Sequence, residues 1–268
     1  YLVQSTPQWR AQLAAEKFYN ANFAGWNELA AAVREEQAKV PGMRLLADNF
    51  KSGAELGFAL GNPDIPVLDH PLNHKHGRAP QLRLWGLQSD GSRDVPTLLV
   101  VGSSDVQYKS LLAYYHQLCE ALGPLPPPRV VNVDHGRQRF LLFTLPATRA
   151  VGACSTPAFA WIDTPTSGAD VDRQLQVTGW AFKDGEGLDR VEVLVNGKVA
   201  ASAEYGKPSP GTEAFWKVSN DPNHPDVGFS ASVDLSSATP GRHWLGLRLH
   251  GRDGSVEDWV EQPIQVAK

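Results

Sequence analysis

Residues 97–104, TLLVVGSS, decide how the N-terminal part of the chain is expected to fold. The run Leu98–Val101 is apolar without a break, which is typical of a strand covered by helices on both faces of a parallel sheet. Residues 43–49 (MRLLADN) and 65–70 (IPVLDH) have the same character and come earlier in the chain. Segments of helical periodicity separate these strands. The sequence therefore predicts an α/β domain with a mostly parallel sheet and helices on both faces.

Helices are expected wherever apolar residues recur every three to four positions. Thr6-Pro7 has the pattern of an N-cap followed by proline at the first helical position. Ser52 and Ser104 each begin a capping box, in which a glutamate or glutamine follows three residues later. We expect helices over residues 6–18, 25–42, 52–61 and 104–122, a hairpin over residues 129–145, and a first domain that covers residues 1–150.

The C-terminal part of the chain changes to short alternating segments after Cys154. Val191, Val193 and Val195 share one face of such a segment, as alternate residues of a strand do. The Asn196-Gly197 pair that follows is a strong signal for a two-residue hairpin turn. Short β-rich segments over residues 155–268 therefore predict an all-β, immunoglobulin-like sandwich as the second domain.

The composition excludes some classes of function. The chain has 25 Lys and Arg against 29 Asp and Glu, a net charge of −4, and no basic stripe that would indicate a nucleic-acid partner. No apolar run in the sequence reaches the ~18 residues of a membrane span. The chain starts at Tyr1 and its single methionine is Met43. We therefore expect a processed chain or a part of a longer protein.

The two cysteines, Cys119 and Cys154, are too few and too far apart for a metal site. Cys119 lies on the apolar face of a predicted helix, and we interpret it as a small apolar side chain there. The alternative is a disulfide with Cys154, which forms in an oxidising compartment.

Polar residues follow each predicted parallel strand, at Asp48, at Asp69 and at Ser103. Ligands of open α/β sheets bind beyond the carboxyl ends of the strands, so we expect a binding crevice there. The segment after the second strand also carries several cationic or titratable side chains. The candidate anion- or ligand-binding residues are Asp48, Asn49, Asp69, His74, Lys75, His76 and Arg78.

This cluster has three interpretations. As an anion site, Arg78 and its cationic neighbours would hold a phosphate or carboxylate, with the guanidinium supplying two parallel donors. As a metal site, His74 and His76 would be joined by Asp69 or His70. As a solvated loop, Asp69 and Arg78 would only fix the local conformation. We assign no metal, because the loop shows no regular helix or strand geometry to align the ligands.

Residues 205–227 form a connection longer than sandwich loops usually are. Its side chains Tyr205, Trp216 and His224 could stack on a sugar face or contact a protein partner. The alternative is that Trp216 packs the loop onto the sandwich, and both interpretations stay open. The sequence contains no nucleophile elbow, P-loop, dinucleotide-binding glycine motif or zinc-protease motif, so we assign no catalytic residue.

Three segments together resemble a known family: residues 25–36 (GWNELAAAVREE), 45–61 (LLADNFKSGAELGFALG) and 67–86 (VLDHPLNHKHGRAPQLRLWG). They are similar to the soluble C-terminal region of bacterial GT-C membrane glycosyltransferases, of the protein-mannosyltransferase and aminoarabinose-transferase type. The resemblance covers about residues 20–145. The tail looks like an immunoglobulin-type extension appended to some of these transferases.

The resemblance implies a non-catalytic, extracytoplasmic domain pair on the periplasmic face of the bacterial inner membrane. In this family the active carboxylate lies between early membrane helices that these residues do not include, and the donor is a polyprenyl-phosphate sugar. The partners would be the transmembrane part of the same chain and a glycan, lipid or protein acceptor. The alternatives are a stand-alone phosphate-handling α/β enzyme, or a carbohydrate-binding or adhesion module.

Overall fold

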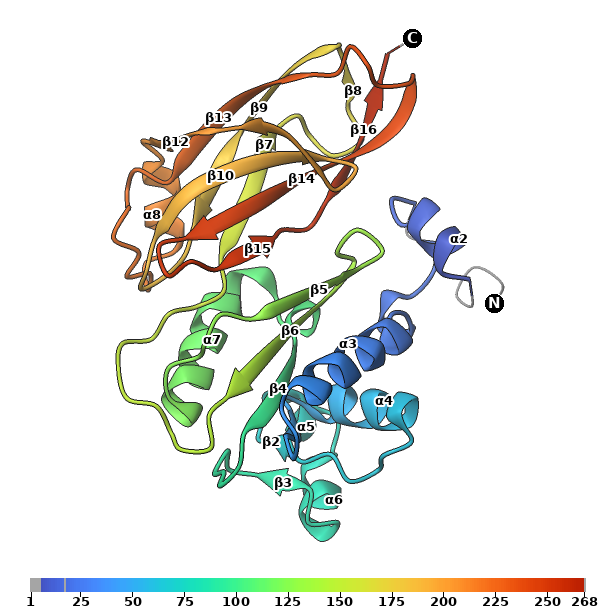
Figure 1. The fold of residues 1–268 in the computed structure, drawn as a ribbon, viewed down its shortest axis with the longest axis vertical. Helices are drawn as coiled ribbons and strands as arrows, with labels where there is room; N and C mark the ends of the chain where they lie inside the picture. The colour runs from blue at the N-terminus through green and yellow to red at the C-terminus, as the bar shows by residue number, and fades with distance from the viewer. Residues whose placement is uncertain (1–5, 17, 268) are drawn as a thin grey trace. The chain divides into compact units, whose positions relative to one another are not determined.

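The computed structural model describes residues 6–16 and 18–267, and these form two compact units. Unit 1 contains Tyr19–Cys154, and unit 2 combines Thr6–Phe18 with Ser155–Lys268 (Figure 1). The N-terminal helix α2 therefore groups with the second unit, although the sequence placed it in the first domain. It is also shorter than expected, spanning Pro7–Gln12.

Unit 1 is built on one six-stranded sheet within the described residues, in the strand order β3-β2-β1-β4-β6-β5. Strands β1 to β4 run parallel to one another, whereas β6 is antiparallel to both β4 and β5. The elements of unit 1 are η1 (Ala21–Phe23), α3 (Trp26–Lys39), β1 (Arg44–Ala47), α4 (Phe50–Leu60), β2 (Val67–Leu68), α5 (Pro71–Lys75), α6 (Ala79–Leu84), β3 (Gln88–Ser89), β4 (Thr97–Gly102), η2 (Ser103–Asp105), α7 (Tyr108–Leu122), β5 (Arg129–Val133) and β6 (Gln138–Leu145).

The predicted fold class, a mostly parallel α/β domain followed by an all-β sandwich, is wrong. The antiparallel ladders β4–β6 and β5–β6 pair six and five residues, whereas the parallel ladders β1–β4, β2–β3 and β1–β2 pair four, two and one. The second unit also contains helices, and the chain as a whole is mixed, with 26% helix and 33% strand.

The physical reason is that an apolar run reports burial and not strand direction. Leu98–Val101 is completely buried, as expected, but so is Phe140–Phe143 in the antiparallel strand β6. The parallel strand β2 is only two residues long because Pro66 has no N–H for a ladder and Pro71 begins the next helix.

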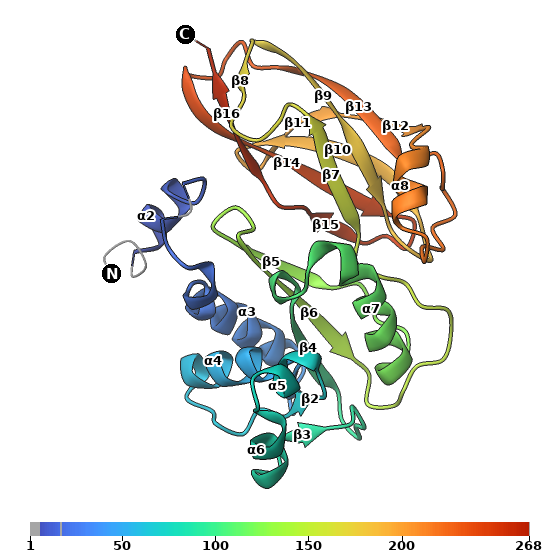
Figure 2. The ribbon, with the colours of Figure 1, turned by 180° about the vertical axis from the view of Figure 1, so that it is seen from behind.

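Helices cover both faces of this sheet. Figures 1 and 2 show α3 and α4 on one side of β4 and β6, and α7 on the other. Alternate strand residues such as Leu98 and Val100 belong to the core that α3 and α4 complete. In this core Trp26 of α3 meets Phe140 with ring centroids 5.0 Å apart. Because helices cover both faces of the sheet, successive strand residues are buried on either face, and this explains the unbroken apolar runs.

A disulfide joins Cys119 at the end of α7 to Cys154 at the end of unit 1, with their Cα atoms 6.0 Å apart. We interpreted Cys119 as an unpaired apolar side chain, and this interpretation is wrong. The segment after β6 returns to α7, and the sequence pattern of the helix alone does not reveal that return. The bridge cross-links a stretch of 35 residues within unit 1.

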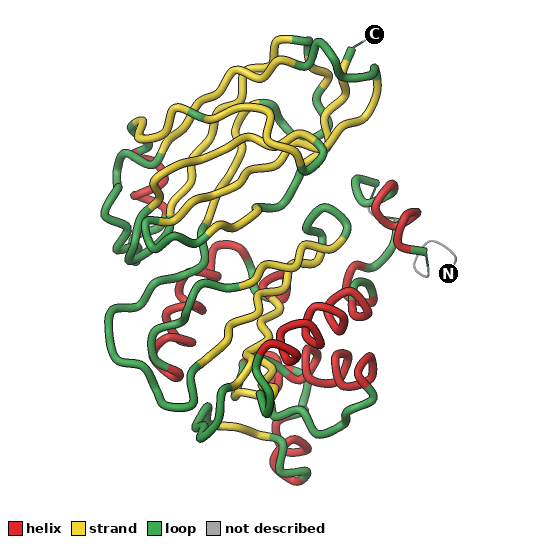
Figure 3. Tube along the Cα trace, in the orientation of Figure 1, coloured by secondary structure: helices red, strands yellow, loops and turns green. Residues whose placement is uncertain are grey.

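Unit 2 is a β-sandwich of two sheets, in the orders β11-β10-β14-β16-β8, with β15 on β14, and β12-β13-β9-β7 (Figure 3). The β10–β11 hairpin turns at Asn196 and Gly197, both with positive φ (51° and 74°), which confirms the predicted turn. The elements after β6 are β7 (Phe159–Thr164), β8 (Asp170–Val171), β9 (Gln174–Phe182), β10 (Leu188–Val195), β11 (Lys198–Ser202), β12 (Glu204–Lys207), α8 (Pro210–Phe215), β13 (Gly228–Asp234), β14 (Gly241–Gly251), β15 (Val256–Asp258) and β16 (Gln262–Val266).

Candidate functional site

Asp48 and Asn49 lie where β1 ends and α4 begins. The Asn49 side chain caps α4 by accepting hydrogen bonds from the backbone N–H groups of Lys51 at 2.9 Å and Ser52 at 3.1 Å. The helix therefore starts three residues before the predicted capping box. Both Asp48 and Asn49 are completely buried, so these two candidate ligand-binding residues lie inside the unit rather than at a surface.

Buried hydrogen bonds hold the Asp48 carboxylate. It accepts from the backbone N–H of Gly102 at 3.1 Å, from the hydroxyl of Tyr114 at 3.2 Å and from the Asn49 amide at 3.0 Å. Burial raises the pKa of Asp48 to about 6, and the nearby charge of Asp105 acts in the same direction. Asp48 thus ties the carboxyl end of β1 to the end of β4 and to α7.

His70 and Asn73 anchor the short helix α5. The Nδ1 atom of His70 accepts from the Leu72 N–H at 3.0 Å, and its ring meets the Tyr114 ring edge-on at 5.1 Å. Burial lowers the pKa of His70, which suits its role as a neutral acceptor. Asn73 is fully buried and accepts from the Phe50 N–H at 2.8 Å. These polar side chains therefore fix α5 against α4 and α7.

Asp69 and His74 face each other on the surface of unit 1. The Nε2 atom of His74 lies 2.6 Å from Oδ1 of Asp69, and both side chains are about half exposed. His76 lies elsewhere, against the ring of Phe50. The three side chains that the metal interpretation requires, His74, His76 and Asp69, therefore do not meet at one point. No group of three or more histidine, cysteine or carboxylate side chains with metal-site geometry occurs among the residues that the structure describes.

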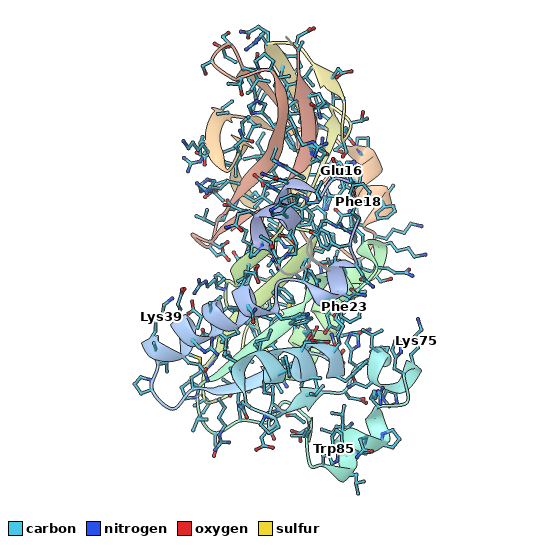
Figure 4. The ribbon with its side chains drawn as sticks, turned by 90° about the vertical axis from the view of Figure 1, so that its right-hand side faces the viewer. Glu16, Phe18, Phe23, Lys39, Lys75 and Trp85 are labelled. Atoms are coloured by element: carbon cyan, nitrogen blue, oxygen red, sulfur yellow. A yellow bond between two sulfur atoms is a disulfide. The ribbon has the colours of Figure 1, made fainter. Side chains whose placement is uncertain are left out.

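His76 and Arg78 gather around Phe50 at the start of α4. The His76 ring centroid is 5.6 Å from that of Phe50, and the Arg78 guanidinium carbon is 6.0 Å from the same ring. Both side chains are exposed, as is Lys75, which projects outward from α5 (Figure 4). The structure therefore brings together part of the predicted anion cluster, in the form of cations beside an aromatic ring.

An apolar groove of about 1000 Å³ begins beside this cationic group. Gly53 and Gly57 form its floor on α4: a Cβ atom at Gly53 would lie 2.8 Å from Val67, and one at Gly57 would lie 2.7 Å from the Asn62 carbonyl. Because both positions are glycine, the following loop and strand approach α4 closely. The lining residues are Phe50, Gly53, Ala54, Gly57, Phe58, Gly61, Asn62, Pro63, Asp64, Ile65, Val67, Arg78, Gln81, Leu82, Trp85 and Leu87.

Large apolar side chains at the rim of the groove are exposed to solvent. Phe58 of α4 is 89% exposed. Trp85, which follows α6 and is labelled in Figure 4, is 65% exposed. Leu84, which precedes Trp85 in the chain, is 80% exposed. An exposed apolar surface of this kind marks a binding site more often than chance. Sequence reasoning missed the groove, although Gly53 and Gly57, four residues apart on one helix, were a usable signal.

In unit 2, Trp216 is an anchor and not an exposed binding residue. It is only 3% exposed, and its ring centroid lies 5.1 Å from Phe159 and 5.7 Å from Phe182 on the outer face of the sheet. Of the two interpretations of Trp216, packing of the loop onto the sandwich agrees with this geometry.

Tyr205 and His224 hold the same loop in place. The Tyr205 hydroxyl donates to the carbonyl of Ala181 at 2.9 Å, and burial raises the pKa of Tyr205 above its usual value. His224 lies 5.2 Å from the ring of Phe182, with its Nε2 atom 3.2 Å from the hydroxyl of Ser219. The three predicted glycan-loop residues therefore make internal contacts.

Comparisons with known proteins show little. No protein-family model and no curated protein matches this sequence. The fibronectin(III)-like modules of CbhA from Clostridium thermocellum are 16% identical, over 41% of this chain and 96% of theirs, with a TM-score of 0.28. CopC from Methylosinus trichosporium OB3b is 13% identical, over 41% of this chain and 94% of its own, with a TM-score of 0.24.

A third similar structure is the endo-β-1,4-mannanase from Thermotoga petrophila. It is 10% identical over 91% of this chain, with a TM-score of 0.30, and this chain spans 44% of that enzyme. TM-scores this low support no conclusion about function. Among the described residues, none of the helices has the length and apolarity needed to cross a bilayer.

Proposed function

We propose that this chain is a non-catalytic, extracytoplasmic domain pair of a membrane glycosyltransferase, and that unit 1 positions the lipid phosphate of a polyprenyl-phosphate sugar. The observation that carries the proposal is the apolar groove along α4 with Arg78 and His76 at one end. The resemblance of residues 20–145 to the C-terminal region of such enzymes supports it.

The groove fits the chemistry of an isoprenoid chain joined to a phosphate. Its lining side chains are mostly apolar, and burial of hydrocarbon contributes about 25 cal/mol per Å². Arg78 is at the Phe50 end of α4, where a guanidinium can offer two parallel donors to a phosphate. Among the described lining residues the one acid is Asp64, which follows the opposite end of the helix. The anionic head would therefore lie at the Phe50 end.

Two further features support a positioning role outside the cytoplasm. The most strongly perturbed carboxyl of unit 1, Asp48, is fully buried and hydrogen-bonded to structural groups, so it is not poised to attack or protonate a substrate. The Cys119–Cys154 disulfide is typical of proteins that fold in an oxidising compartment.

Binding of geranylgeranyl phosphate to the 268-residue chain, measured by calorimetry, tests the proposal. We expect Arg78→Gln to weaken binding about tenfold, the loss of one charge-assisted contact of about 1.4 kcal/mol. The matched control is Arg83→Gln, because Arg83 is exposed on α6, the helix that begins directly after Arg78, but does not line the groove. Rising salt should also weaken binding. Absence of binding, or equal losses in the two variants, would contradict the proposal.

A further inference from the structure

The outer face of the sheet β12-β13-β9-β7 presents two adjacent tryptophans. Trp161 on the edge strand β7 and Trp180 on β9 are register partners, so their side chains lie next to each other on the same face. Trp161 is 53% exposed and Trp180 is partly exposed. The opposite face of the same strands carries the core, for example Val177 and Ala181, which are both completely buried.

The α8 segment covers only one end of this face. Trp216, which follows α8, lies over Phe159 and Phe182 and also meets Trp180 edge-on, with ring centroids 6.4 Å apart. Figure 2 shows α8 at one end of β9. On the other side of Trp180 its register partner is Gly228, which has no side chain to cover the indole. Each of the two indoles therefore keeps part of its surface exposed to solvent beyond the packed end of the face.

Neutral hydrogen-bonding side chains continue the face beside the indoles. Thr178 pairs in register with Ser230, and the Gln176 amide donates to the Ser232 hydroxyl at 3.0 Å. All four are at least partly exposed. The surface thus joins aromatic rings to hydroxyl and amide groups.

Few charges lie around these groups. On the neighbouring strand β12, Glu204 and Lys207 neutralise each other at 2.8 Å. On β7, the exposed carboxyl of Asp163 follows two residues after Trp161 and would repel an anion. Among the residues that the structure describes, this face therefore offers no cluster of cations for a phosphate or for an anionic membrane surface.

We propose that this face binds a neutral glycan, with sugar rings on Trp161 and Trp180 and sugar hydroxyls bonded to Thr178, Ser230 and Gln176. A pyranose ring has C–H groups on its faces and hydroxyls at its rim, which match indole faces bordered by neutral donors and acceptors. An anionic bilayer surface would instead favour basic side chains beside the aromatic ones. The site is separate from the groove of unit 1 and does not depend on the function proposed for it.

The experiment titrates the 268-residue chain with three neutral oligosaccharides, cellohexaose, β-1,4-mannohexaose and maltohexaose, by calorimetry and tryptophan fluorescence. We expect at least one to bind. Trp161→Ala should weaken that binding at least tenfold, and Trp161→Phe should keep most of it because a ring remains. The matched control is Trp9→Ala, which removes an exposed indole (61%, against 53% for Trp161) that lies on α2, outside this sheet and outside the groove of unit 1, and it should leave sugar binding unchanged.

Two results would overturn this inference. One is absence of binding to all three oligosaccharides by the folded wild-type chain. The other is binding that Trp161→Ala leaves intact while its melting temperature is unchanged. Geranylgeranyl phosphate binding by Trp161→Ala distinguishes the two proposals, because it should equal that of the wild type whether or not the glycan site exists.

Discussion

The segment 67–85 of unit 1 and the segment 205–227 of unit 2 look alike in sequence, since both gather histidine, aromatic and charged residues in a connection. The structure separates them. In the segment 67–85, polar side chains that cap a helix, such as His70, are buried, whereas the cation Arg78 is exposed. In the second, the aromatic Trp216 is itself the buried anchor. The comparison teaches that the same residue types build a binding surface or a packing contact according to what lies beneath them.

The largest effect is expected when Trp216, the buried side chain that holds the 205–227 loop in unit 2, is truncated. Trp216→Ala should reduce the free energy of unfolding of unit 2 by about 3–5 kcal/mol, because it removes a buried indole that fills the space above Phe159 and Phe182. Urea unfolding followed by circular dichroism measures the loss. The neighbouring Phe215 is 60% exposed, so Phe215→Ala is the matched control and should cost less than about 1 kcal/mol.

If Trp216→Ala and Phe215→Ala have equal small effects, the packing account of the 205–227 loop is wrong. The exposed-ligand interpretation of Trp216 would then return. Equal large effects would show that α8 as a whole, rather than one indole, holds the loop.

The second prediction concerns unit 1, in which the buried polar group is the carboxyl of Asp48. The pKa of Asp48 is raised from 3.8 to about 6 by burial. Between about pH 4 and pH 6 the folded state therefore keeps a proton that the unfolded state has lost, and the stability of unit 1 should fall as pH rises through this window. The contribution is on the order of 2–3 kcal/mol, at 1.36 kcal/mol for each pH unit of difference.

Asp48→Asn should remove this part of the pH dependence, because an amide does not titrate. Unfolding by urea at pH 4, 5, 6 and 7 measures the slope. Asp64→Asn is the control, since Asp64 is exposed in the loop after α4, and it should leave the slope as in the wild type. A slope that is the same in Asp48→Asn and in the wild type would refute the assignment.

Local signals in the sequence identified most elements but not how they pair. The runs around Leu98 and Val67 are strands, and Asn196-Gly197 is a hairpin turn, because burial and turn geometry are properties of a few neighbouring residues. Strand direction in β6 and the partner of Cys119 depend on residues far away in the chain. These are the features that the sequence patterns left wrong.

The candidate site shows the same division. The sequence singled out Arg78 and His76, which the structure places together beside Phe50. The sequence also singled out Asp48, because an acid at the end of a strand can either bind a ligand or hold neighbouring elements together inside the fold. The complete burial of Asp48 in the structure distinguishes the two roles and indicates the second. The groove and the Trp161–Trp180 pair were missed because each forms from segments that are not adjacent in the sequence.

The smallest effect is expected in the exposed part of the first segment, at the pair of Asp69 and His74. Both side chains are about half exposed, so water and salt screen their attraction. An exposed ion pair contributes about 0.2–1 kcal/mol to the free energy of unfolding. His74→Ala should therefore change the free energy of unfolding by less than about 1 kcal/mol. Asp69 follows β2 and His74 lies on α5, so the pair links two neighbouring points of one short segment. If the metal interpretation were right, added zinc would raise the melting temperature of the wild type but not that of His74→Ala. We expect zinc to leave both unchanged, because the side chains that would complete the site lie against Phe50 and Tyr114.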